Sequence, residues 1–110
     1  MLRDPEADIH VPSLCDVEVV AGLRRGLAHR LLAEERAAEA IDDYLDLPVT
    51  RHGHQALVSR VLELRRNFSA YDATYVALAE RIGGTLLTAD HHLARATRAH
   101  TTVATTPLTG

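Results

Sequence analysis

Residues 69–90 have the sequence SAYDATYVALAERIGGTLLTAD, which predicts a helix, a sharp turn and a strand in succession. Ser69 is a typical helix N-cap, and the glycines at 83–84 end the helix because glycine adopts the left-handed backbone of a helix C-terminus at little cost. Thr85–Thr88 is short with an apolar centre and predicts a buried strand. Asp90 then starts a last helix that we expect to reach about residue 98. An acidic residue therefore follows the carboxyl end of a strand.

The rest of the chain predicts more helices separated by short extended segments. Ser13 is a plausible N-cap for the first helix, and Pro48 stops the second. Apolar spacing predicts helices over residues 13–28, 31–47 and 54–66, and extended segments over residues 49–52 and 101–105. Helices that alternate with short apolar strands indicate an α/β fold with a parallel sheet. We expect one domain over residues 1–110, with residues 106–110 as a loose tail.

Composition limits the classes of protein that this chain can represent. It has 110 residues, 46% of them hydrophobic and 25% charged, as in one ordinary globular domain. No apolar run approaches the roughly 20 residues of a membrane-spanning helix, and the first residues lack a signal-peptide layout. The single cysteine, Cys15, cannot form an internal disulfide, which favours a reducing compartment such as the cytoplasm. The net charge of −3 argues against a nonspecific nucleic-acid binder, although an acidic metal site would lower the charge of a nuclease too.

Three acidic residues, Glu18, Asp72 and Asp90, fall where carboxylates could gather. Glu18 lies about 40° round its helix from Leu14, and Asp72 also lies at the edge of an apolar stripe. Asp90 follows a strand at the end where open α/β sheets bind ligands. Mg²⁺ and Mn²⁺ prefer carboxylate oxygens and water, and such ions polarise phosphoryl groups and lower the pKa of bound water. The pattern predicts a metal site but does not identify a reaction.

Simpler structural roles explain the same three positions. Asp90 is a natural N-cap, and Asp72 stands three residues after Ser69, as in an acidic variant of the capping box. Glu18 could pair with Arg25 or another base. From spacing alone, these structural roles are the stronger interpretation of each acid.

The residues around the acids form three motifs. Residues 10–14, His-Val-Pro-Ser-Leu, lead to Glu18 and then to Leu-Arg-Arg at 23–25. Residues 70–80 have the sequence AYDATYVALAE, and residues 87–90 have the sequence LTAD. Over about residues 9–104 the chain resembles the PIN-domain toxins called VapC, at their second, third and fourth motifs.

This resemblance implies both a fold and an activity. The fold would be a three-layer α/β domain, with a central parallel sheet and helices on both faces. The activity would be that of a cytoplasmic, Mg²⁺- or Mn²⁺-dependent endoribonuclease, the toxin of a VapBC-type pair. RNA would be the substrate, a VapB-type antitoxin the partner, and a homodimer the usual assembly. By the match, Asp72 and Asp90 would be metal ligands and Glu18 a direct or water-mediated ligand, and these three would be the catalytic residues. Thr88 would be a polar neighbour of the site.

Other residues add candidates around this site. Arg95 and Arg98 follow Asp90 on its helix and could contact an RNA backbone. Tyr71 and Tyr75 share a predicted stripe with apolar residues, which favours core positions over base stacking. The seven histidines match no Cys/His ligand set for zinc, so we expect them at the surface or at helix ends.

The chain departs from the family pattern at its start. The family begins with a central strand that carries an acid in an Asp-Ala-Ser-type motif, whereas residues 1–6 are polar and interrupted by Pro5. Neither Asp4 nor Asp8 is a good substitute, so we expect the first central strand and its acid to be missing. Two explanations stay open. Either the protein begins upstream of this sequence, which the well-kept remainder favours, or it is a relic with impaired catalysis that binds a partner.

Overall fold

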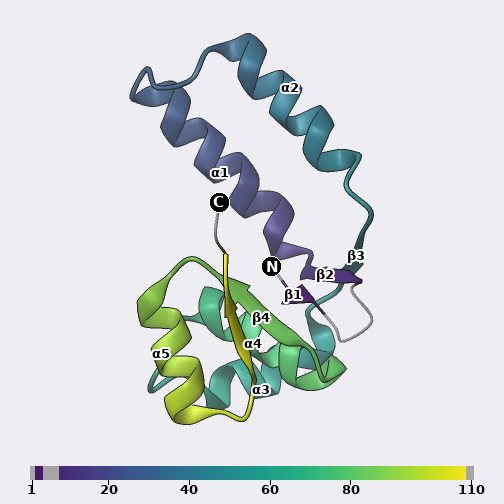
Figure 1. Ribbon diagram of the computed structural model, residues 1–110, viewed down its shortest axis with the longest axis vertical. Helices are drawn as coiled ribbons and strands as arrows, with labels where there is room; N and C mark the ends of the chain where they lie inside the picture. Colours follow the sequence, from purple (N-terminus) through teal and green to yellow (C-terminus); the bar gives the residue numbers. More distant parts are fainter. Residues whose placement is uncertain (1, 4–7, 109–110) are drawn as a thin grey trace. The chain divides into compact units, whose positions relative to one another are not determined.

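The computed structural model describes residues 2–3 and 8–108 (Figure 1). In chain order, its elements are β1 (Leu2–Arg3), β2 (Ile9–Pro12), α1 (Leu14–Ala28), α2 (Glu34–Leu45), β3 (Val49–His52), the 3₁₀ turn η1 (Gln55–Leu57), α3 (Val58–Glu63), α4 (Ala70–Ile82), β4 (Thr85–Thr88), α5 (His91–His100) and β5 (Thr105–Pro107). The chain divides into two compact units, and each is described by itself. The sheet unit comprises residues 1–13 and 49–110, and the hairpin unit comprises residues 14–48.

The sheet unit contains one five-stranded sheet in the order β3-β2-β1-β4-β5. β2 pairs with β3 in parallel, and β4 pairs with β5 in parallel. β1 lies at the centre and is antiparallel to both of its neighbours, with Leu2 opposite His10 on one side and Leu86 on the other. The expected parallel pairing is present on both sides of the sheet, and β1 at its centre departs from it. Only five residues connect β1 to β2, and a parallel pair needs a crossover of about a dozen or more.

The start of the chain also corrects the expectation that the central strand is missing. Leu2–Arg3 occupies the central position, although this strand is only two residues long. Pro5 follows the strand and so does not interrupt it. Asp4 lies outside the described residues, and Asp8 is exposed immediately before β2. The central strand therefore carries no acid of its own.

The core of the sheet unit is built around α4, which packs against β1, β2 and β4. Ser69 caps this helix, its Oγ accepting a hydrogen bond from the backbone N–H of Asp72 at 3.0 Å, as the sequence predicts. Gly83 ends the helix in the left-handed conformation, with φ of 66°. The buried cluster combines small and large apolar side chains from α4 with residues from η1, the turn between α3 and α4, β4 and the loop before β5, among them Leu57, Leu64, Phe68, Ala73, Val76, Ala77, Leu78, Ala79, Leu86 and Val103.

The apolar stripe predicted for α4 is only partly right. Leu78 and Ala79 are buried and Tyr75 packs against the core, but Tyr71 is 63% exposed. Burial instead covers a broad face that includes Ala73 and positions 76–79. α4 packs on the sheet and is also contacted by α3, so it buries more than one apolar stripe. A prediction based on a single stripe therefore placed Tyr71 in the core, although it is exposed.

Two crossovers complete the sheet unit, one from β3 to β4 through α3 and α4, and one from β4 to β5 through α5. Both advance across the sheet in the same direction, and right-handed crossovers of this kind place α4 and α5 on one face. α5 contacts both β4 and β5 (Figure 1). A second helical layer on the opposite face stays a prediction.

Several boundaries differ from those expected. The helix expected over residues 54–66 is split into η1 and α3. The last strand is at Thr105–Pro107 rather than 101–105, so residues 106–107 are not part of a loose tail. Thr101 instead ends α5, its hydroxyl donating to the Thr97 carbonyl at 2.7 Å and accepting from the Val103 N–H at 3.1 Å. A threonine that bonds its local backbone in this way competes with strand formation.

The hairpin unit consists of α1 and α2, which pack against each other. The Tyr44 hydroxyl near the end of α2 donates to Oδ1 of Asp16 at the start of α1, at 2.6 Å. Burial and this hydrogen bond raise the pKa of Tyr44. At the other end of the hairpin, a Cβ at Gly26 would lie 3.2 Å from the Cβ of Leu32, so glycine permits the close turn. Within the described residues, no helix is both long and apolar enough to cross a membrane.

Candidate active site

Asp90 is positioned by the end of β4 and the start of α5. Its backbone N–H donates to Oγ1 of Thr88 at 3.0 Å, so the strand's last side chain fixes the turn. Its Oδ1 accepts the backbone N–H groups of His92 and Leu93, at 2.9 and 3.1 Å. The predicted N-cap is therefore confirmed. The other carboxylate oxygen has no partner within the described residues and is open to solvent, so capping leaves it available for a ligand.

Asp72 lies in the first turn of α4 and is half-buried. α4 returns to the sheet through the tight turn at Gly83 and Gly84 and then continues as β4, so the helix runs opposite to the strand. Its first turn therefore faces the sheet edge at which β4 ends. This chain direction favours the same edge of the sheet unit for Asp72 and Asp90, and their meeting in one site stays a prediction.

Glu18 lies in the hairpin unit, in the second turn of α1, and is half-buried. The structure therefore places two of the three predicted acids on one unit and the third on the other. Within the described residues of either unit, no three His, Cys, Asp or Glu side chains are grouped so that they could hold a metal ion. The part of Glu18 in a metal site stays a prediction.

The donor set at the sheet edge fits a hard divalent cation. Mg²⁺ usually binds through one or two carboxylates and completes its shell with water and substrate phosphate. Asp72 and Asp90 would supply two such carboxylates. Zinc would instead need three or four ligands of the Cys/His type, and the described residues do not group them. The residues present therefore fit Mg²⁺ or Mn²⁺ better than zinc.

The remaining predicted residues also lie on the sheet unit. Thr88 contacts Asp90 directly through the bond described above. Arg95 and Arg98 are exposed on α5. Arg95 bonds the ring of His92 at 2.9 Å, and Arg98 donates to Oγ1 of Thr105 at 3.0 Å. Both guanidinium groups keep further N–H donors for an anion, so their contact with RNA stays a prediction.

A histidine pair on β2 and β3 was not predicted. Nδ1 of His10 and Nε2 of His52 lie 2.8 Å apart, and the rings are tilted by 36°. Burial, followed by the charge of His10, lowers the pKa of His52. The two positions are 42 residues apart in sequence, and only the parallel pairing of β2 with β3 brings them together. The pair joins an edge strand to its neighbour.

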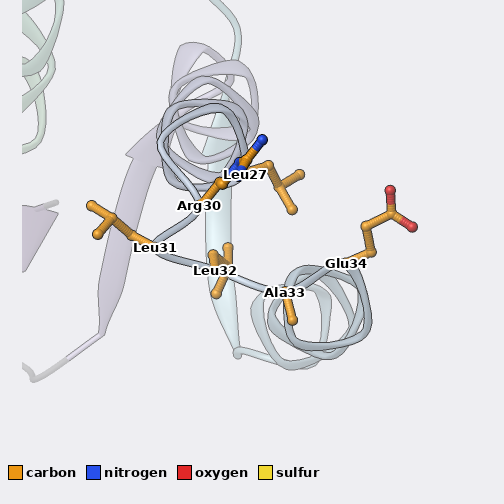
Figure 2. A pocket seen from close by; sticks show the side chains of 6 residues that line it. All are labelled: Leu27, Arg30, Leu31, Leu32, Ala33 and Glu34. Atoms are coloured by element: carbon orange, nitrogen blue, oxygen red, sulfur yellow. The ribbon is translucent and has the colours of Figure 1, made fainter.

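The hairpin unit has a hollow of about 460 Å³ at its turn (Figure 2). It is lined by apolar and charged side chains from the end of α1 to the start of α2, namely Leu27, Arg30, Leu31, Leu32, Ala33 and Glu34. Figure 2 shows the Glu34 carboxylate extending away from the leucines. The hollow contains no clustered carboxylates or other catalytic groups, so it does not compete with the sheet edge as an active site.

An α/β sheet whose strand β4 leads to Asp90, preceded by a helix with Asp72 in its first turn, is an arrangement compatible with an oxygen-ligated divalent metal. The family model of the PIN domain matches residues 2–99, and the chain belongs to this family. It is 39% identical to Ribonuclease VapC9 of Mycobacterium tuberculosis (strain ATCC 25618 / H37Rv) over 99 residues, which cover 90% of this chain and 78% of the relative. The same values hold for VapC ribonuclease Mb0985 of Mycobacterium bovis. Ribonuclease VapC12 of M. tuberculosis is 33% identical over 87 residues, covering 79% of this chain and 67% of the relative.

Proposed function

We propose that this protein is a metal-dependent endoribonuclease of the PIN class and the toxin of a VapBC-type pair. One observation supports the proposal: in a chain of this family, Asp90 follows the carboxyl end of β4, and Asp72 lies in the first turn of α4, the helix that leads into that strand. Relatives named VapC ribonuclease support RNA as the substrate. The reaction would be hydrolysis of an RNA phosphodiester bond.

Asp72 and Asp90 would hold Mg²⁺ or Mn²⁺, with Glu18 as a further direct or water-mediated ligand. A bound ion of this kind supplies positive charge to a phosphoryl oxygen and lowers the pKa of a bound water. The chain's own part is orientation. Asp90 is held by two backbone N–H groups, and Thr88 holds its backbone in turn. Ligands fixed before the substrate arrives need little rearrangement during the reaction.

Substitution of Asp72 tests this function. Asp72→Asn keeps the side-chain shape and the backbone N–H that bonds Ser69, so the helix cap should persist. We expect it to abolish Mg²⁺-dependent cleavage of RNA. Asp43→Asn is the matched control, because Asp43 is an exposed carboxylate on α2, and it should cleave as the unaltered protein does. Cleavage unchanged in Asp72→Asn would remove this residue from the mechanism.

The partners follow from the same proposal. A VapB-type antitoxin and a second copy of the chain are the expected protein partners, in the cytoplasm. The hairpin unit supports protein binding, because five of the nine large hydrophobic side chains exposed among the described residues lie on it: Val17, Val20, Leu31, Leu45 and Leu47. Exposed apolar groups on one unit often mark a protein interface. Light scattering after size-exclusion chromatography would show whether the chain is a dimer.

A second candidate function is partner binding with impaired catalysis. It is favoured by the central strand, since Leu2–Arg3 supplies no acid where the family is expected to carry one. Titration with Mg²⁺, followed by calorimetry or NMR, separates the two candidates. Saturable binding that Asp72→Asn removes supports the nuclease, whereas no saturable binding supports the partner-binding module.

A further inference from the structure

Tyr71 differs from the other aromatic side chains in its surroundings. Phe68 is buried, Tyr75 packs against the core, and Tyr44 is hydrogen-bonded to Asp16. Tyr71 is 63% exposed and makes no hydrogen bond within the described residues. An exposed aromatic ring has an apolar face that water solvates poorly and that a nucleobase can cover.

Two exposed arginines precede α4 in the same segment. Arg66 has no ion-pair or hydrogen-bond partner within the described residues. Arg65 donates one N–H to the Leu62 carbonyl at 3.1 Å, which orients the side chain and leaves its other donors available. Arg60, by contrast, is held by Glu80 in a two-point ion pair at 2.8 and 3.0 Å. The α3–α4 turn thus presents two guanidinium groups that the fold does not neutralise.

The turn that carries these side chains is anchored at both ends. Leu64 and Phe68 are buried in the core, while the residues between them face solvent. The backbone N–H groups of Asn67 and Phe68 both donate to the Leu64 carbonyl, at 3.2 Å each. An anchored turn loses little conformational entropy when it binds a ligand.

The position of the turn connects it to the proposed cleavage site. Tyr71 directly precedes Asp72, so their Cα atoms are about 3.8 Å apart. A phosphate bound through a metal ion at Asp72 would therefore place a neighbouring nucleotide near the helix turn that carries Tyr71. Arg65 and Arg66 lie just before the same helix, where their guanidinium groups can contact phosphates of the same RNA strand.

We infer that Arg65, Arg66 and Tyr71, together called the α3–α4 rim, bind single-stranded RNA beside the proposed catalytic edge. This inference rests on the proposed function. Tyr71 stacks on an unpaired base, while the arginines bind phosphates on either side. Guanidinium groups suit phosphate because they can donate two parallel hydrogen bonds. Unpaired RNA is the ligand because the bases of a duplex are already stacked on one another and cannot cover the ring.

Binding of a fluorescein-labelled single-stranded RNA of about ten nucleotides tests the inference. Anisotropy is measured in EDTA, so that the RNA is not cleaved. Tyr71→Ala should weaken binding roughly 5- to 100-fold, the range expected for loss of one base–aromatic stack, and Tyr71→Phe should bind nearly as the unaltered protein does. Arg66→Ala should weaken binding and reduce the slope of log K against log salt by about 0.7, the value for one phosphate contact.

Arg81→Ala is the matched control. Arg81 is exposed in the last turn of the same helix, at the opposite end from Asp72, and has no partner within the described residues. Arg81→Ala removes the same charge as Arg66→Ala. If both substitutions weakened RNA binding equally, general charge attraction would explain the binding and the proposed role of the α3–α4 rim would be refuted. Unchanged binding by Tyr71→Ala would also overturn it, as would equal affinity for duplex RNA.

Cleavage is measured separately, so the two proposals can fail independently. If Asp72→Asn stops cleavage but the rim variants bind RNA normally, the rim is refuted and the nuclease stands. If the rim variants lose RNA binding while the protein cleaves no RNA with either metal, the rim stands and the nuclease is refuted.

Discussion

Asp90→Ala and Asp90→Asn separate the helix-capping contribution of this residue from its proposed part in metal binding. Oδ1 of Asp90 accepts two backbone N–H groups at the start of α5. Alanine removes both bonds, and loss of such a cap costs about 1 kcal/mol of the free energy of unfolding, within a range of about 0.5–2 kcal/mol. In a chain of this size, that lowers Tm by about 4 °C. Asparagine keeps the accepting oxygen and loses only the favourable charge at the helix N-terminus, about 0.3 kcal/mol at an exposed position.

Thermal unfolding by circular dichroism and Mg²⁺-dependent RNA cleavage give the two readouts. Stability should fall in the order aspartate, asparagine, alanine. Both variants should lose cleavage to the same extent, because neither carries the anionic oxygen that a divalent ion requires. Full cleavage by Asp90→Asn would refute the metal-binding role. Equal destabilisation by the two variants would refute the capping argument, since only alanine leaves the N–H groups without an acceptor.

Three other perturbations test the fold. Leu78→Ala, at a side chain only 1% exposed, should cost about 2–5 kcal/mol in urea unfolding through lost burial and a cavity, and a cost below 1 kcal/mol would contradict its place in the core. Gly83→Ala should lower the free energy of unfolding by about 1 kcal/mol, because φ is 66° at this residue and a side chain strains the backbone there. A Cβ at Gly83 would meet no atom within 4 Å, so no steric clash adds to this strain. Gly53→Ala is the control and should be nearly neutral in the same assay, because Gly53 has neither a positive φ nor a close neighbour. The lowered pKa of His52 means that the folded state binds fewer protons than the unfolded state. Its contribution to stability is therefore complete above the ordinary pKa of ~6.5, and it is lost as pH falls from that value through the lowered pKa of the folded state. The urea midpoint should therefore fall between about pH 7.5 and 5.5, and His52→Gln should fall less; an equal fall would exclude His52 as the source.

Local signals made residues 69–90 predictable. The Ser69 cap, the left-handed Gly83 and the Asp90 cap each depend on a few neighbouring residues, and all three are confirmed. The prediction that Asp72 and Asp90 share one sheet edge rests on chain direction alone. The short strand Val49–His52 was also predicted correctly.

Features that depend on distant pairing were not predictable. Leu2–Arg3 is too short to show any periodicity, and its strand identity comes from partners on both sides. The histidine pair depends on the register of β2 with β3, which no local pattern specifies. The error at Tyr71 has a different cause, since the width of a helix's buried face depends on how many elements cover it. The hairpin unit likewise could not be separated from the rest by composition.

The central strand has a consequence for the order of folding. Leu2 is synthesised before β2 and β3, whereas its partner Leu86 is synthesised only after both of them. β2 and β3 can pair before Leu86 is made, and α1 and α2, which lie between these two strands in the sequence, can also form by then. The middle of the sheet, however, cannot close until β4 has emerged. Until then Leu2–Arg3 have only one of their two neighbouring strands, so the two halves of the sheet are joined only after β4 has been made.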